Sequence, residues 1–110
     1  MMRSPMSNNK GIKQWASDAL DAAAGSQSET LSLPQGAVGI PKVLKVSGAV
    51  SALVTITFGN GAQVVAVCNP NGPKDEVEIP STAFPNPTNS VAVTVNASAA
   101  GYVYIAVGFV

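Results

Sequence analysis

From residue 29 to the final residue, apolar and polar positions alternate along the chain in short runs. The clearest run is SALVTITFG, in which Val54, Ile56 and Phe58 fall on one side of an extended strand and Thr55 and Thr57 on the other. Similar runs are SETLSLP, PKVLKVSGAV, AQVVAVC, EVEIP, SVAVTVN and GYVYIAVGFV. Because successive side chains of a strand point to opposite faces, this pattern predicts six or seven short strands, each with one face on a core.

Turn sequences separate these runs. Gly59-Asn60-Gly61 predicts a hairpin between SALVTITFG and AQVVAVC, because Asn-Gly readily adopts positive φ. Residues 69–75 and 80–90 are rich in proline and asparagine, and proline is excluded from central strands. Short strands, frequent turns and abundant valine predict an all-β fold, an antiparallel β-sandwich of the jelly-roll or Greek-key type. An immunoglobulin-like sandwich is the alternative.

The segment before residue 29 has a different period. Its apolar residues recur at intervals of three and four, which is the spacing of one helix face. They are Ile12, Trp15, Ala16, Ala19, Leu20 and Ala23. This pattern predicts a short helix over about residues 12–24, preceded by a polar, flexible arm. The chain therefore divides into an arm and helix, residues 1–28, and a β-sandwich domain, residues 29–110.

The apolar stripe of the predicted helix needs a partner, because a helix of this length is marginal in isolation. The stripe can pack on the chain's own domain, or on another protein with Trp15 as the anchor. The sequence leaves both open. Arg3, Lys10 and Lys13 make the beginning of the chain basic.

Charged residues make up only 11% of the chain, and their formal sum is zero. Typical soluble domains have about 25% charged residues, and no charged residue occurs after Glu78. A surface this poor in charge is typical of a protein whose neighbours cover it, so we expect an oligomer or a component of a larger assembly. With so few basic residues, a nucleic-acid partner is not expected. Nor is a membrane partner, because TNS and NASAAG interrupt the apolar end of the chain.

The residue types that carry most enzyme chemistry are scarce. The sequence has no histidine and a single cysteine, Cys68, which ends an apolar run and is expected in the core. General acid–base catalysis, activated serine nucleophiles and zinc sites usually depend on such residues. No phosphate-binding loop or dinucleotide fingerprint occurs either. We therefore expect no enzyme activity, no cofactor and no metal site.

One carboxylate cluster, Asp75, Glu76 and Glu78, lies in KDEVE. On a strand, Glu76 and Glu78 share a face, where they could bind calcium together with loop carbonyl groups. We favour a solvated strand edge instead, because charges at an edge also block pairing with another sheet.

The run GYVYIAVGFV has two different faces. Val103, Ile105, Val107 and Phe109 form an apolar face, and Tyr102 and Tyr104 lie on the other face beside small residues. Tyrosine combines apolar area with a polar tip, so this pair suits either a subunit interface or a ligand platform. A third possibility is that the predicted helix or a loop covers both tyrosines.

The layout of a basic arm and small helix, MMRSPMSNNKGIKQWASDALDAAAG, before a charge-poor β domain resembles the decoration (cement) proteins of tailed-phage heads. The resemblance implies a non-enzymatic protein of the virion, made in the host cytoplasm and bound on the capsid exterior between major capsid subunits. It also implies a homo-oligomer, usually a trimer. If the protein has this function, we expect Tyr102 and Tyr104 at the subunit interface. The residues expected on the capsid are Arg3, Lys10, Lys13, Trp15 and Leu20. The alternative function is a small carbohydrate-binding, adhesin or tail-fibre module.

Overall fold

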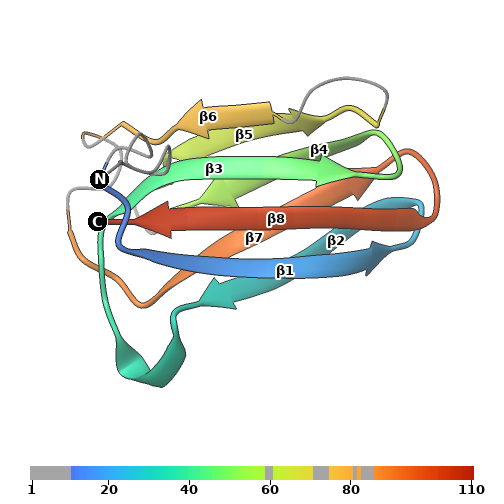
Figure 1. Ribbon diagram of the computed structural model, residues 1–110. Coiled ribbons are helices and arrows are strands. Elements are labelled where there is room, and N and C mark those ends of the chain that lie inside the picture. Colours follow the sequence, from blue (N-terminus) through green and yellow to red (C-terminus); the bar gives the residue numbers. More distant parts are fainter. Residues whose placement is uncertain (1–10, 59–60, 71–74, 81, 83–85) are drawn as a thin grey trace, which may run out of the picture.

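The protein is a sandwich of two antiparallel sheets, each with four strands (Figure 1). The computed structural model describes residues 11–58, 61–70, 75–80, 82 and 86–110. The strands are β1 (Gln14–Ala22), β2 (Gly25–Ser32), β3 (Pro41–Gly48), β4 (Ala52–Thr57), β5 (Gln63–Cys68), β6 (Asp75–Glu78), β7 (Ser90–Ala97) and β8 (Gly101–Phe109). The predicted antiparallel β-sandwich is therefore confirmed.

The first sheet has the order β1-β8-β3-β6 and the second sheet has the order β2-β7-β4-β5. Every connection except the one between β4 and β5 passes from one sheet to the other. β4 and β5 are neighbours in the second sheet and form the predicted hairpin. In Figure 1 the first sheet lies in front, with β8 between β1 and β3. Strands that are distant in sequence are thus neighbours in both sheets.

The predicted helix over residues 12–24 is wrong, because this segment contains β1 and the turn into β2. In the described part of the chain, the one helical element is a 3₁₀ turn at Pro34–Gly36. β1 pairs with β8 along its whole length, and the backbone N–H of Lys13 extends the ladder to the carbonyl oxygen of Phe109 at 2.9 Å. This ladder supplies hydrogen bonds and packing that a short isolated helix lacks, so tertiary pairing overrides the local helical spacing.

The predicted boundary at residue 28 falls inside β2, and both sheets contain strands that begin before it. Residues 1–10 of the predicted arm lie outside the described residues. No helix in the described part of the chain is long and apolar enough to cross a membrane.

The core lies between the sheets and consists mainly of β-branched side chains. Alternate positions of the strands point inward, and burying each side chain of this size contributes about 1.5–3 kcal/mol. The almost completely buried residues between the sheets include Leu44, Val46, Val54, Ile56, Val93, Val95, Val103, Ile105, Val107 and Phe109. Cys68 is also buried, as predicted, and burial raises the pKa of its thiol.

Gly48 ends β3 where the two sheets come close together. A methyl group at this position would overlap the backbone oxygen of Tyr102, and it would lie 2.9 Å from Cα of Val103 and 3.2 Å from Sγ of Cys68. The first two neighbours are backbone atoms of β8, which cannot move without disturbing the ladder between β3 and β8. The close approach therefore requires glycine.

Gly48→Ala should lower the free energy of unfolding by about 2–3 kcal/mol, because overpacking here displaces backbone. Urea denaturation of both proteins measures the difference. Gly101→Ala is the matched control, since a methyl group there meets only side-chain atoms of Val50, which can shift. Equal losses in the two variants would contradict this account of Gly48.

Candidate functional site

The outer face of the first sheet carries the aromatic residues that the sequence analysis singled out. Because directly paired residues share a face, the β1–β8 register places Trp15 beside Gly108, Ala19 beside Tyr104, and Asp21 beside Tyr102. Trp15 and both tyrosines therefore lie on one surface of the molecule. They point away from the core that β8 forms with its alternate residues.

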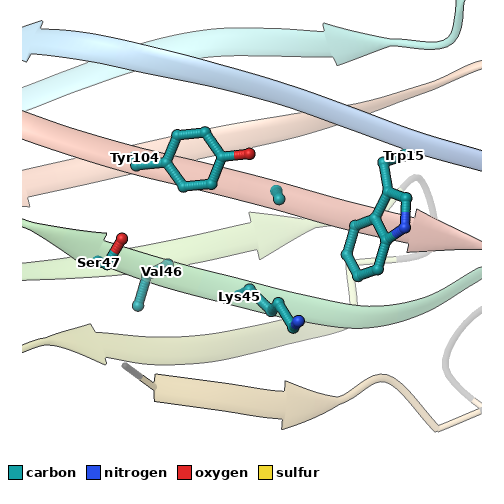
Figure 2. A pocket seen from close by; sticks show the side chains of 6 residues that line it. Trp15, Lys45, Val46, Ser47 and Tyr104 are labelled. Carbon is teal, nitrogen blue, oxygen red and sulfur yellow. The ribbon is translucent and has the colours of Figure 1, made fainter. Parts of the chain in front are cut away.

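A hollow of about 320 Å³ lies on this face. We call it the Trp15–Tyr104 hollow, and it is lined by Trp15, Lys45, Val46, Ser47, Tyr104 and Ala106. Figure 2 shows the two aromatic rings on either side of it, with Lys45 and Ser47 on the neighbouring strand β3. In the register, Ala106 lies opposite Lys45, and Tyr104 lies opposite Ser47. The small side chain of Ala106 leaves space between the larger residues.

Lys45 and Trp15 are in direct contact across this hollow. The Nζ atom of Lys45 lies 5.1 Å from the centroid of the Trp15 ring, which is within the range of a cation–π interaction. No ion pair of Lys45 occurs in the described part of the chain, although Glu76 lies opposite it on β6. The site therefore presents a positive charge held beside an aromatic surface.

Gly108 allows the outer face to pack closely beside Trp15. A methyl group on Gly108 would lie 2.9 Å from both Cδ1 of Ile12 and Cγ1 of Val43. The side chains of Ile12 and Val43 therefore cover Gly108, which is the residue of β8 that pairs with Trp15. Their packing supports the end of the hollow that Trp15 forms.

The structure separates the residues that were predicted to act together. Tyr102 and Tyr104 are 50% and 38% exposed, but only Tyr104 lines the hollow. Trp15 and Leu20, which share a stripe on a helix, have opposite orientations on β1, and Leu20 packs against the core. Lys13 is exposed next to β1, whereas Arg3 and Lys10 lie outside the described residues. Contact of these residues with a capsid stays a prediction.

Sequence reasoning did not assign a site role to Lys45 or Ser47. Their alternation with Leu44 and Val46 indicated an outward orientation, which the structure shows for both. Their place beside Tyr104 and Trp15 depends on the register between β3, β8 and β1, and local alternation does not reveal which strands are neighbours.

Among the described residues, no charged side chain lies on the outer face of the second sheet. Its exposed large apolar residues are Leu53, Val65 and Val67, which come from β4 and β5. The remaining outward positions are small or polar and uncharged: Ser26, Ser28, Thr30, Thr55, Thr57, Gln63, Ala92, Thr94 and Asn96. We call this surface the uncharged face.

Two carboxyl groups meet at one edge of the sandwich, between β1 and β2. Asp18 and Glu29 both occupy inward positions, opposite Ile105 and Val93 respectively. Burial, a hydrogen bond with Asp18 and the charge of Asp18 raise the pKa of Glu29 to about 7. The Oε2 atom of Glu29 is buried and has no hydrogen-bond partner among the residues that the structure describes.

The carboxylates of β6 have different surroundings. Glu76 and Glu78 are exposed on an edge strand of the first sheet, and Asp75 is paired with Val46 in the ladder. Among the described residues, no group of three or more histidine, cysteine or acidic side chains is placed to hold a metal ion.

Comparison of the chain with protein-family models, curated proteins and solved structures finds no match. The functional inference therefore depends on the two outer faces and on the strand order.

The raised pKa of Glu29 predicts that stability falls as the pH rises. A glutamate whose pKa is about 7 in the fold, against an ordinary value of 4.5, contributes stability that is full below about pH 4.5 and lost as the pH rises through about 7. Glu29→Gln should therefore flatten the decrease in melting temperature between pH 5 and pH 8. Asp21→Asn is the control, because Asp21 is exposed on the outer face of the neighbouring strand β1 and points away from Glu29. A slope in Glu29→Gln as steep as that of the unchanged protein would refute this role of Glu29.

Proposed function

We propose that the sandwich is a jelly roll. The strand order supports this, because a jelly roll consists of eight strands in two sheets built from two Greek keys, in which the first strand lies beside the last. Here β1 lies beside β8 and β2 lies beside β7, while β4 and β5 form a hairpin. Jelly rolls occur in viral capsid proteins and in lectins, so the fold is compatible with both functions that the sequence suggested.

We further propose that the protein is a non-enzymatic structural component of a virus particle, which binds between major capsid subunits and stabilises the shell. The observation that carries this proposal is the uncharged face. Leu53, Val65 and Val67 are 44%, 44% and 52% exposed on a surface without any charge, whereas a free monomer normally keeps such surfaces charged. A surface that is covered by other copies of the protein does not need charged residues.

In this proposal the two outer faces have different tasks. The uncharged face, in place of the surface with Tyr102 and Tyr104 that the sequence suggested, contacts sister copies in a trimer or another closed ring. The opposite face, with Trp15 and the nearby Lys13, is directed at the capsid. Each bound copy stabilises the assembled shell by mass action, because it binds the assembled subunits and not the dispersed ones.

A second candidate function is a carbohydrate-binding module, and the Trp15–Tyr104 hollow favours it. Two aromatic side chains and two polar side chains converge on a space of about 320 Å³, within the range of small-molecule sites. The hollow and the proposed capsid contact share the face that carries Trp15, whereas self-association uses the opposite, uncharged face.

Self-association is tested by size-exclusion chromatography with light scattering. The unchanged protein should elute as an oligomer, and Val65→Lys should give a monomer, because it places a charge among the exposed apolar residues of the uncharged face. Ala19→Lys adds the same charge to an exposed position of β1 on the other face and should leave the oligomer intact.

Capsid binding is tested by co-sedimentation with heads of the phage that encodes the chain, prepared without this protein. Binding should raise the temperature at which the heads disrupt. A protein that is monomeric at all concentrations and does not sediment with heads would refute the structural function.

A further inference from the structure

We propose that the Trp15–Tyr104 hollow binds an acidic saccharide, with a sugar ring between the two aromatic side chains and its carboxylate on Lys45. This inference goes beyond capsid stabilisation, and it gives a chemical class to the ligand of the second candidate function. It rests on the geometry of the outer face of the first sheet.

The separation of the aromatic side chains leaves room for sugar rings between them. Trp15 lies beside Gly108, which is four residues along β8 from Tyr104. At about 3.3 Å per residue, these two positions are about 13 Å apart. Ala106 lies midway between them, and its small side chain leaves space at the bottom of the hollow. A pyranose has apolar C–H faces, which cover aromatic surface, while its hydroxyl groups stay at the rim.

Lys45 supplies the preference for an acidic ligand. Its ammonium group lies over the Trp15 ring and forms no ion pair within the described part of the chain. A carboxylate bound beside it gains a charge-assisted hydrogen bond, which is stronger than a hydrogen bond between neutral groups. The lysine is already held at the site by the indole, so less side-chain freedom is lost on binding.

The hydroxyl groups of Ser47 and Tyr104 provide further polar contacts. They come from paired positions of β3 and β8, at the end of the hollow away from Trp15. Neither hydroxyl has a hydrogen-bond partner in the described part of the chain. Both can therefore donate to, or accept from, the hydroxyl groups of a sugar.

Three carboxylates on the same face, those of Asp21, Glu76 and Glu78, set the electrostatic limits of the site. Glu76 lies directly opposite Lys45 on β6, and Asp21 lies beside Tyr102 on β1. Glu76 opposes the approach of an anion and competes for Lys45, whereas Asp21 lies at the far end of the face. Removing the charge of Glu76 should therefore strengthen binding of an acidic sugar and leave a neutral sugar unaffected.

Trp15 is the only tryptophan of the sequence, so its fluorescence reports directly on the site. Titration with tetragalacturonate should change the emission to saturation, whereas its fully methyl-esterified form, which keeps the same sugar chain without the charges, should bind at least about tenfold more weakly. Raising the salt concentration should weaken binding of tetragalacturonate. Calorimetry gives the same affinities for variants that alter the fluorescence itself.

Variants then assign the contacts. Lys45→Met should weaken binding of tetragalacturonate about tenfold, and Lys45→Arg should preserve it. Glu76→Gln should tighten it about two- to threefold. Tyr104→Ala and Trp15→Ala should both reduce binding to background, and far-UV circular dichroism checks that each variant is folded. If Trp15→Ala does not fold, Lys45→Met and Tyr104→Ala still decide the result.

Matched controls use residues of the same type outside the hollow. Tyr102→Ala, on the same face of β8, and Lys42→Met, on β3, should leave the affinity unchanged. Equal affinity for both sugars, no binding of either sugar, or a Tyr102→Ala loss as large as that of Tyr104→Ala would overturn the proposal.

Co-sedimentation with heads is measured separately, so a protein that binds heads but not tetragalacturonate would refute this inference alone. If the unchanged protein binds no sugar and Trp15→Ala loses binding to heads, the hollow is a protein contact instead.

Discussion

The structure depends on the position of β8 in the middle of the first sheet. This strand pairs with β1 along one edge and with β3 along the other. Its inward residues, from Val103 to Phe109, are completely buried against the second sheet. A strand paired on both edges leaves no free backbone groups and determines which residues stand beside each other on its outer surface. The Trp15–Tyr104 hollow is a consequence of this double pairing, because it takes side chains from all three strands.

Much of the fold was predictable because the buried strands alternate cleanly. In SALVTITFG and SVAVTVN every second residue is apolar, and both runs are strands with the expected inward faces. β1 was misassigned because its alternation is obscured. Asp18 occupies an inward position and Ala19 an outward one, so the apolar residues resemble a helix stripe more than a strand. β1 is an edge strand, so the inward carboxylate of Asp18 can reach solvent and Glu29. For this reason β1 tolerates a polar residue at an inward position.

The candidate site was predictable only within single strands. The shared face of Tyr102 and Tyr104 followed from alternation in GYVYIAVGFV, and so did the outward orientation of Lys45 and Ser47. The contact between Lys45 and Trp15 joins residues thirty positions apart through the intervening strand β8. Such a contact follows from strand order and register, which a single sequence does not specify.

The crossing of the chain between the sheets has a consequence for biosynthesis. Apart from the β4–β5 hairpin, each strand pairs with strands that lie far away in the sequence. β1 has no partner in its sheet until residues 101–109 have left the ribosome, and until then β3 can pair only with β6. Folds dominated by such distant pairings form slowly and expose apolar surface meanwhile. While these pairings are incomplete, association of the exposed valine-rich strands with other chains competes with folding.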